Sequence, residues 1–386
     1  MAYQLRDYQQ QASNAAVHAF KSKSGKNGLL ILPTGSGKSL IIADIASRLD
    51  GSLLVLQPSK EILEQNYAKL CSYGVMDVGI FSASAGRKDI NRITFAMIGS
   101  VMNKMEQFAH FKYVLIDECH LVNSKGGMYE KFINAEERVV IGLTATPYRL
   151  TNNIDGTSQL KFLTRTRPRI FEKVLYYCQV RDLLAKGYLA KLRYFDLTNI
   201  DMTRVRSNST GAGYNDQSLI QEYERSGFYQ QLISTVKRLL RPKSGIPRKG
   251  ILVFTQFRSE AEKLVSEIPL SAIVTGDTPK NERETILKAF KKGLIQVVAN
   301  VGVLTTGFDY PELDTVVMAR PTKSLALYYQ IVGRAIRPSE GKDGWFVDLC
   351  GNYRKFGKVD DLLISNLGRE KWCVTSNGKQ LTNVIM

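Results

Sequence analysis

Residues 29–49 read LLILPTGSGKSLIIADIASRL and combine three kinds of segment. Four apolar residues typical of a buried strand come first, a loop with two glycines follows, and the rest has the apolar spacing of a helix. This order places several backbone N–H groups and the positive end of a helix around one anion. We therefore predict a phosphate-binding loop whose backbone is formed by Thr34, Gly35, Ser36 and Gly37.

Two side chains at the end of this loop have the chemistry of a nucleotide site. We expect Lys38 to reach the β and γ phosphates of a nucleotide and the Ser39 hydroxyl to ligate Mg²⁺. The alternative is an ordinary turn with a solvated lysine, which requires neither a strand before it nor a helix after it. At Leu32 the chain departs from the usual motif, which has glycine or another small residue there, but the residues that face the anion are intact.

The composition indicates a globular protein with a polyanionic partner. Of 386 residues, 44% are hydrophobic and 23% charged, which excludes a disordered or collagen-like chain and suffices for two domains. The 53 lysines and arginines against 36 acidic residues give a net charge of +17, which favours attraction to a polyanion. Five scattered cysteines without C-x-x-C spacing indicate neither a disulfide framework nor a zinc site, and favour a reducing compartment.

No apolar run approaches the roughly 20 residues that cross a bilayer, and the N-terminus lacks the apolar region of a signal peptide. We therefore expect a cytoplasmic protein without a membrane partner.

Short apolar runs alternate with stretches of helical period, such as residues 60–70, and this pattern occurs twice. It is typical of an α/β fold in which helices cover a mostly parallel sheet. In the first half we predict strands at 29–32, 53–56, 93–98, 113–116 and 139–143. In the second half we predict strands at 251–254, 272–274, 295–299, 315–318 and 345–348.

Between the halves the period fades. Residues 151–169 are rich in Thr, Asn and basic residues, and we predict a basic surface insertion there. Residues 199–227 hold Ser, Thr, Asn and glycines, which suits a long loop or a mobile accessory element. The predicted domains are a first lobe, a linker with an accessory insertion, a second lobe, and a C-terminal hairpin with a tail, at 1–170, 171–228, 229–366 and 367–386.

Two carboxylates, Asp117 and Glu118, directly follow the predicted strand at 113–116. Because parallel strands end at the same edge of a sheet, we expect both beside the phosphate-binding loop. Asp117 is placed to hold the Mg²⁺ shell, and Glu118 to orient and deprotonate an attacking water. A solvated acidic pair is the alternative, against which the glycine loop argues. His120 is not interpreted as a metal ligand, since a lone histidine is more often a packed or surface residue.

Four motifs in order resemble those of superfamily 2 helicases of the DExH type. They are GSGKS, DECH, TATP and QIVGRAIR, at 35–39, 117–120, 144–147 and 330–337. The similarity runs from residue 5 to about residue 349 and implies two tandem RecA-like P-loop lobes that clamp ATP and Mg²⁺. The spellings LRDYQ (5–9), DECH and LTATPYR (143–149) resemble in particular the RadD-like and UvsW-like helicases of bacteria and phages, which remodel branched DNA.

The resemblance implies that Arg6 and Gln9 flank the adenine of ATP and that Asp309 belongs to the nucleotide site. Without the other motifs, the segment around Gln9 could as well be the polar start of a helix as a contact for adenine. The resemblance also implies that Thr144 and Thr146, together with His120, relay the nucleotide state into movement of the lobes. A simple β-turn before the following proline is the competing interpretation of the threonines.

In the second lobe, Gln330, Arg334 and Arg337 recur at three to four residues and are expected on one helical face. Guanidinium groups suit the charge of a phosphoryl transition state, and arginines supplied by the opposite lobe would make hydrolysis depend on closure. A basic solvated helix face is the alternative. The other motifs favour an arginine-finger role for both arginines.

Nucleic-acid contacts are expected at strand ends and helix starts, where hydroxyl and N–H groups bind phosphates without reading bases. Each of these serines and threonines is equally well a helix cap. Phe257 is a candidate for base stacking, whereas Phe254 is better explained as core. The positions that match the family motifs are Pro58, Ser59, Ser100, Thr275, Gly276 and Thr305.

Residues 372–382 carry an Asn-Gly turn between β-prone runs and predict a hairpin, which we expect to pack on the second lobe. The whole pattern predicts a monomeric ATP-dependent DNA helicase or translocase. It would bind single-stranded, forked or branched DNA, largely independently of sequence, in replication, recombination or repair. An RNA helicase, an ATP-gated clamp that does not translocate and a translocase subunit of a restriction system remain rival interpretations.

Overall fold

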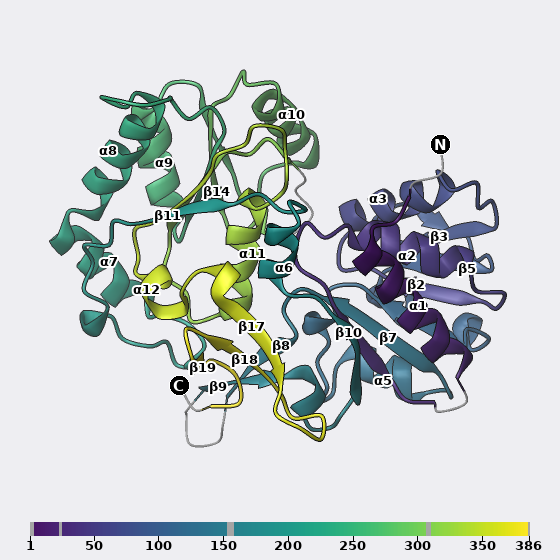
Figure 1. Cartoon of the computed structure of the whole chain (residues 1–386). Helices are drawn as coiled ribbons and strands as arrows, with labels where there is room; N and C mark the ends of the chain where they lie inside the picture. Colours follow the sequence, from purple (N-terminus) through teal and green to yellow (C-terminus); the bar gives the residue numbers. More distant parts are fainter. Residues whose placement is uncertain (1–3, 23–24, 153–157, 306–309, 385–386) are drawn as a thin grey trace.

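The computed structural model describes residues 4–22, 25–152, 158–305 and 310–384. These residues form two α/β lobes, a two-stranded hairpin and a small C-terminal sheet. Figure 1 shows the first lobe on the right in purple and blue, the second lobe on the left mainly in green, and the C-terminal sheet in yellow below and between them.

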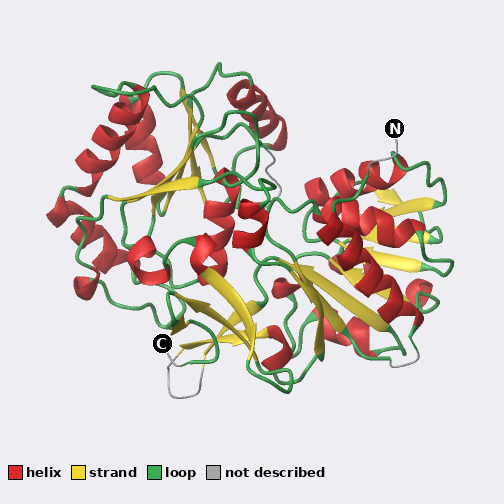
Figure 2. Ribbon diagram, viewed as in Figure 1, coloured by secondary structure: helices red, strands yellow, loops and turns green. Residues whose placement is uncertain are grey.

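The first lobe contains an eight-stranded sheet with the order β10-β1-β7-β6-β2-β5-β3-β4, in which only the pair β3–β4 is antiparallel. The inner strands are short apolar runs because both faces of the sheet are covered by helices (Figure 2). The strands are β1 (Gly28–Ile31), β2 (Leu53–Leu56), β3 (Val78–Ser82), β4 (Arg87–Lys88), β5 (Ile93–Ala96), β6 (Tyr113–Ile116), β7 (Val139–Thr144) and β10 (Lys173–Tyr177). The helices are α1 (Asp7–Lys21), α2 (Lys38–Ser47), α3 (Lys60–Cys71), α4 (Ile98–Met102) and α5 (Met128–Asn134).

The second lobe contains a six-stranded, fully parallel sheet with the order β11-β16-β15-β12-β14-β13. Its strands are β11 (Leu192–Asp196), β12 (Ile251–Thr255), β13 (Ser271–Val274), β14 (Val297–Val301), β15 (Thr315–Ala319) and β16 (Gly344–Asp348). Its helices are α7 (Asp216–Ser226), α8 (Phe228–Leu240), α9 (Arg258–Glu267), α10 (Lys280–Lys291), α11 (Leu325–Ala335) and α12 (Asn352–Phe356).

The α/β prediction is confirmed, and each strand predicted from the sequence overlaps a strand of the structure. Within residues 171–228, β10 pairs with β1 and β11 pairs with β16, so both segments are edge strands of the two lobes. Helix α6 (Val180–Ala185) lies on the connection between them.

The prediction of a loop or mobile element at residues 199–227 is wrong for residues 216–226, which form helix α7. Asn215 caps the helix by accepting a hydrogen bond from the Ser218 N–H (3.0 Å). Its buried face includes Leu219 and Tyr223, and the Tyr223 ring stacks on Phe228 at 4.0 Å between centroids. The helix was missed because polar residues dominate its other faces.

The prediction of a basic surface insertion at residues 151–169 is also wrong in its main point. The strands β8 (Tyr148–Asn152) and β9 (Ser158–Phe162) pair as an antiparallel hairpin, and Leu160, Phe162 and Leu163 are buried. Residues 153–157 lie outside the described part of the chain. The apolar residues of β9 alternate with polar ones, so the basic character of the stretch concealed a half-buried strand.

The C-terminal hairpin is confirmed, and it contacts the second lobe as predicted, but it also contacts the first lobe, which was not predicted. Strands β18 (Trp372–Ser376) and β19 (Lys379–Gln380) flank the Asn-Gly turn, and β17 (Leu362–Asn366) completes a three-stranded sheet. The sheet docks on the β8–β9 hairpin. The Trp372 ring stacks on Phe162, and the Asn383 side chain accepts a hydrogen bond from the Phe162 N–H (3.0 Å).

No helix in the described parts of the chain is both long and apolar enough to span a membrane.

Candidate nucleotide site between the lobes

The glycine loop leaves β1 and leads directly into α2. Gly35 and Gly37 have φ angles of 82° and 79°, a left-handed region in which residues with a Cβ are strained. Gly37 is the N-cap of α2, so the helix begins at Lys38 and its first N–H groups face the loop. The Ser36 hydroxyl is buried without a hydrogen-bond partner. These features fit a backbone cradle for an anion.

The acidic motif meets this loop, as the sequence predicted for the end of β6. The Lys38 ammonium lies 2.9 Å from the Glu118 carboxylate, and both side chains are mostly buried. Burial alone would raise the pKa of Glu118, but the Lys38 charge and the hydrogen bond from His120 hold it well below its usual value. Burial and the neighbouring Glu118 charge raise the pKa of Asp117 to about 6. Glu118 is therefore a carboxylate, able to accept a proton, at neutral pH.

His120 connects the acidic motif with both lobes. Its Nδ1 lies 3.0 Å from the Thr144 hydroxyl and 3.3 Å from the Glu118 carboxylate, and its Nε2 lies 3.1 Å from the Gln330 amide nitrogen. Because the Gln330 amide donates to Nε2, the proton of a neutral ring is on Nδ1. Thr144 also accepts a hydrogen bond from the Thr146 N–H (3.0 Å). The predicted coupling residues thus form one chain of contacts that reaches the second lobe.

The second lobe supplies Gln330 and Arg334 from α11, whereas Arg337 lies beyond the helix. The prediction that all three share one helical face is therefore wrong for Arg337, since α11 ends at Ala335. They nevertheless line the same cavity as the glycine loop. Gly333 backs directly on Thr34, where a Cβ would lie only 2.9 Å from the threonine, so the lobes are in close contact.

Most of the residues predicted for catalysis or nucleotide binding line this one cavity. From the first lobe these are Thr34, Gly35, Gly37, Lys38, Ser39, Asp117 and Glu118, and from the second lobe Gln330, Arg334 and Arg337. Four lining residues were not anticipated, namely Ile62, Gln65, Pro311 and Pro338. They belong to none of the recognised motifs and reach the cavity only through folding. Asp309 lies outside the described residues.

Arg6 and Gln9 lie beside the glycine loop rather than in the cavity. The Gln9 amide donates a hydrogen bond to the Ser36 carbonyl (2.8 Å) and accepts one from the Arg6 N–H (2.9 Å). The Arg6 guanidinium lies 4.1 Å from the ring centre of Tyr188, which comes from the connection between the lobes. The sequence did not identify Tyr188, because no motif contains it.

Magnesium has a plausible pair of protein ligands in the cavity. The Ser39 hydroxyl and the Asp117 carboxylate both line it. Asp117 accepts hydrogen bonds from the Glu118 N–H (2.9 Å) and the Asn66 amide (3.4 Å), which orient its oxygens. Within the described ranges no group of three or more His, Cys, Asp or Glu residues could hold a metal ion. Because both donors are oxygens, they fit a hard cation whose other ligands are phosphate and water oxygens.

The predicted nucleic-acid residues are more dispersed. Ser59 caps α3, and its hydroxyl accepts a hydrogen bond from the Ile62 N–H (3.4 Å), so its capping role is realised. Ser100 accepts a hydrogen bond from the Ala83 N–H (3.0 Å), and Thr275 accepts one from the Asp277 N–H (3.2 Å). Pro58 precedes the cap of α3, Gly276 is exposed, and Thr305 is half-buried. Phe254 is core, as expected, while Phe257 caps α9 and packs edge-on against Tyr223.

The starts of α3 and α10 approach each other across the gap between the lobes. Lys60 lies beside Lys280 from the second lobe, and each pairs with a glutamate one turn further along its own helix. Lys60 also donates a hydrogen bond to the Ser84 carbonyl (2.9 Å). Two basic helix starts therefore meet at one place.

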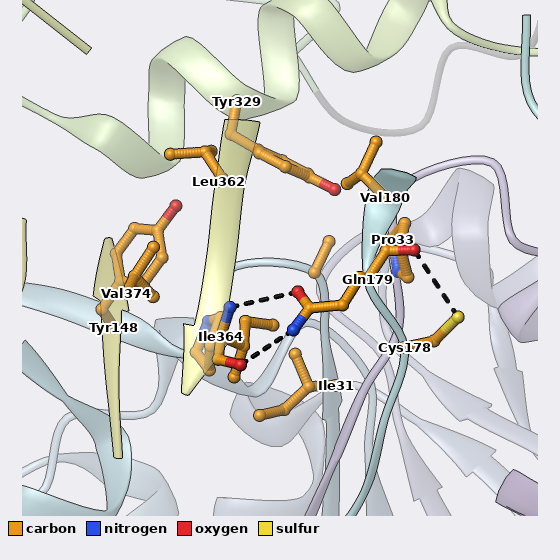
Figure 3. A pocket seen from close by; sticks show the side chains of 12 residues that line it. Ile31, Pro33, Tyr148, Cys178, Gln179, Val180, Tyr329, Leu362, Ile364 and Val374 are labelled. Carbon is orange, nitrogen blue, oxygen red and sulfur yellow. Dashed lines mark hydrogen bonds between the residues drawn. The ribbon is translucent and has the colours of Figure 1, made fainter. Parts of the chain in front are cut away.

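A second junction between the lobes lies behind the glycine loop (Figure 3). A small apolar pocket there is lined by Ile31 from β1, Tyr329 from α11 and Val374 from the C-terminal sheet, among others. The Gln179 side chain donates a hydrogen bond to the Ile364 carbonyl (2.8 Å) and accepts one from the Ile364 N–H (3.1 Å). The C-terminal sheet thus braces the connection between the lobes.

These features define a P-loop protein with two tandem RecA-like lobes. Residues 2–149 match the sequence family described as "Type III restriction enzyme, res subunit", and residues 231–339 match the "Helicase conserved C-terminal domain". Together with the relatives described next, these matches show that the chain belongs to the superfamily 2 helicases. The finer resemblance to RadD-like and UvsW-like proteins remains a prediction.

Three curated relatives span most of the chain. The 51.5 kDa protein of Lactococcus phage (isolate 7-9) is 26% identical over 333 residues, covering 85% of this chain and 66% of the relative. DNA 3'-5' translocase XPB2 of Sulfurisphaera tokodaii is 25% identical over 370 residues, covering 87% and 79%. Putative ATP-dependent helicase IRC3 of Saccharomyces cerevisiae is 24% identical over 366 residues, covering 88% and 50%. The chain therefore matches under two thirds of two of these relatives.

Solved structures with similar folds include two restriction enzymes. A fragment of a putative HsdR subunit of a type I enzyme from Vibrio vulnificus has a TM-score of 0.69 and 23% identity, covering 93% of this chain and 67% of that one. The Type ISP restriction-modification enzyme LlaBIII bound to DNA has a TM-score of 0.66 and 18% identity, covering 91% and 28%. At these identities the likeness concerns the fold.

Proposed function

We propose that the protein is an ATP-dependent DNA helicase or translocase that unwinds or remodels forked or branched DNA. The observation that carries this proposal is the single cavity in which Lys38 and Glu118 of the first lobe face Arg334 and Arg337 of the second. Support for DNA comes from the net charge of +17 and from relatives named DNA translocase or helicase.

In the proposed mechanism the glycine loop holds the phosphates of ATP. Lys38, now paired with Glu118 at 2.9 Å, turns to the β and γ phosphates and leaves the carboxylate available to the attacking water. Glu118 keeps its contact with His120, which favours the ionised form of the carboxylate, so it can orient that water and accept its proton. Arg334 and Arg337 stabilise the charge that develops on the transferred phosphoryl group.

Magnesium, held by Ser39 and Asp117, would neutralise phosphate charge when bound. The protein's own part is to orient the two ligands. Asn66 and the Glu118 N–H fix the Asp117 carboxylate, and the start of α2 places the Ser39 hydroxyl at the loop.

Coupling to DNA would use the contacts that cross between the lobes. His120 contacts Glu118, Thr144 and Gln330. A change in the position or charge of the Glu118 carboxylate can therefore shift His120 and, through Gln330, helix α11. On the proposed DNA side, Lys60 and Lys280 lie beside each other at two helix starts. A DNA backbone bound there by both lobes would be drawn along as the lobes close and reopen, provided that the two grips differ in strength.

ATP hydrolysis with different nucleic acids tests the proposal. We expect DNA to stimulate hydrolysis at least about tenfold, with forked and four-way DNA more effective than duplex, and RNA much less effective. If RNA stimulated ATP hydrolysis as much as DNA or more, the protein would be classified as an RNA helicase. A strand-displacement assay on forked DNA separates a motor from an ATP-gated clamp, which hydrolyses ATP without releasing a strand.

A second candidate function is the motor of a restriction system. It is favoured by the match of residues 2–149 to the res subunit family and by the two restriction enzymes of similar fold. Such a motor would move along duplex DNA and displace a third strand from a triplex without unwinding the duplex. Triplex displacement combined with failure to open a forked duplex would favour this candidate over a helicase.

A further inference from the structure

Lys342 lies in the loop that connects α11 with β16, behind the nucleotide cavity. Its side chain is half-buried and donates two hydrogen bonds, both of 2.8 Å, to the backbone carbonyls of Pro311 and Arg337. Neither the helicase motifs nor the proposed catalytic residues include this lysine. It belongs to the second lobe and is distant in sequence from the glycine loop.

The two carbonyls belong to residues that both line the cavity. Arg337 contributes a proposed catalytic guanidinium, and Pro311 comes from the loop between β14 and β15. These two loops approach the cavity from different parts of the second lobe. Lys342 therefore joins two walls of the cavity from behind and fixes the backbone from which the Arg337 side chain extends.

The rest of this loop is held independently of Lys342. Arg248 donates hydrogen bonds to the Asp343 carbonyl and to the Thr315 hydroxyl (2.9 Å), and its guanidinium lies 4.7 Å from the ring centre of Trp345. The end of the loop near β16 is thereby anchored to the sheet. Lys342 provides a corresponding anchor at the end near Arg337.

The site also uses lysine at an electrostatic cost. Burial and the neighbouring Arg337 charge lower the pKa of Lys342 to about 8. A neutral side chain would avoid this cost. It would not, however, combine a long flexible chain with enough N–H donors for both carbonyls. The two carbonyl oxygens compensate this cost in part, because each accepts a hydrogen bond from the ammonium group.

We propose that Lys342 is a positioning residue for ATP hydrolysis, which holds Arg337 at the transition state by tying its backbone to Pro311. The inference rests on the proposed ATPase function. A purely structural alternative exists, in which Lys342 only caps α11 and stabilises the second lobe. The two differ in whether the effect of losing Lys342 depends on the presence of the Arg337 side chain.

The test is a double-mutant cycle with Lys342→Met and Arg337→Ala, measured in the full chain with saturating DNA. We expect Lys342→Met to lower kcat for ATP roughly 10- to 100-fold, as a small misplacement of a catalytic group does, while KM changes less than about threefold. In the Arg337→Ala background the same change should lower kcat less than about twofold, because the group that it positions is gone. Lys342→Arg, which keeps a cation with several donors, should recover part of the rate.

Lys323→Met is the matched control. Lys323 is also a partly buried lysine of the second lobe with two hydrogen bonds, to the Ser207 hydroxyl and the Gly211 carbonyl, but neither of these partners lines the cavity. Its loss should leave kcat within about twofold of the wild type. Thermal unfolding of every variant shows whether it is folded at the assay temperature.

Three outcomes would overturn the proposal: an equal fall in kcat in both Arg337 backgrounds, a rise in KM without a fall in kcat, or a similar loss in Lys323→Met. If the methionine variant does not fold, Lys342→Gln replaces it, and unfolding of both would assign Lys342 to the framework of the lobe and refute a positioning role. A wild-type chain without DNA-stimulated ATPase activity would refute the proposed function itself, which is a separate result.

Discussion

The two lobes have the same parallel-sheet architecture but present opposite chemistry to the cavity between them. The first lobe contributes Lys38, Asp117 and Glu118, with lysine and glutamate already paired at 2.9 Å. Of the residues that the structure describes, the second lobe contributes Gln330 and two cations, Arg334 and Arg337, to the lining, and no carboxylate. The lysine and the glutamate of the first lobe are thus paired with each other, and the second lobe presents two guanidinium groups to the same cavity.

This difference indicates that the two lobes have different parts in the proposed reaction. A cradle, a candidate metal ligand and a candidate base in one lobe suffice to bind ATP and to orient water. In the proposed mechanism the arginines of the other lobe add to the stabilisation of the transition-state charge, so the rate of hydrolysis depends on how the lobes are held together. Variants on the two sides should consequently fail in different ways.

The largest effect is expected for Lys38→Ala. Removing the ammonium takes away the phosphate contact and leaves Glu118 without its neutralising partner, so hydrolysis should fall on the order of 10³-fold or more. ATP binding should weaken as well, while DNA binding should stay within about twofold, because Lys38 is not among the residues proposed to contact DNA. The measurements are steady-state ATPase activity and DNA affinity, with exposed Lys131→Ala as the control. Substantial hydrolysis by Lys38→Ala would refute the cradle.

The next effect is expected for Arg337→Ala on the other lobe. Loss of a guanidinium that acts on the transition state should lower kcat roughly 10³-fold while the affinity for ATP changes little. Single-turnover hydrolysis and equilibrium binding of a fluorescent ATP analogue give the two quantities. If binding and hydrolysis weakened equally, Arg337 would be a ground-state contact, and the contrast between the lobes would disappear.

A smaller effect is expected at the contact that joins the two lobes. Gln330→Ala removes the hydrogen bond to His120, a contribution of about 1 kcal/mol, and should lower DNA-stimulated hydrolysis roughly five- to tenfold. His120→Ala should have an effect of at least that size, and the double variant should be no worse than His120→Ala. The readout is the ratio of ATPase activity with and without DNA. Fully additive effects would show that the contact does not couple the lobes.

Much of the fold could be predicted because its strands are short, continuous apolar runs. Runs such as 53–56 and 113–116 are buried on both faces, and their limits agree with β2 and β6. Helix α7 could not be predicted in the same way, since only a narrow apolar face packs on the lobe. The docking of the C-terminal sheet on the β8–β9 hairpin escaped prediction because it depends on a contact between Trp372 and Phe162, which no local pattern encodes.

The cavity residues that lie within sequence motifs could also be predicted, because each motif is local in sequence. The glycine loop and the acidic strand end obey rules that hold over a few residues, so their meeting at one sheet edge follows from parallel topology. The contact of Gln330 with His120 and the two bonds of Lys342 join distant segments. Such contacts arise from the packing of one lobe on the other, or of one loop on another, and sequence spacing carries no signal for them.

The smallest effect on activity is expected for Glu260→Gln, which replaces a buried carboxylate of the second lobe. Unlike Glu118, whose pKa Lys38 lowers, Glu260 has its pKa raised to about 7 by burial, although it accepts hydrogen bonds from the Gln256 and Phe257 N–H groups. Its other oxygen is buried without a partner, which favours the protonated form.

A raised pKa of an acid means that the folded state keeps a proton which the unfolded state releases between about pH 4.5 and 7. The contribution of Glu260 to stability is therefore largest at low pH and is lost as pH rises through this window. Glu260→Gln mimics the protonated acid and removes this dependence. At pH 5 the two proteins should have similar free energies of unfolding, and at pH 8 the glutamine variant should be more stable by up to about 3 kcal/mol. Urea unfolding at both pH values measures this difference, and a wild type that gains stability relative to the variant as pH rises would contradict it.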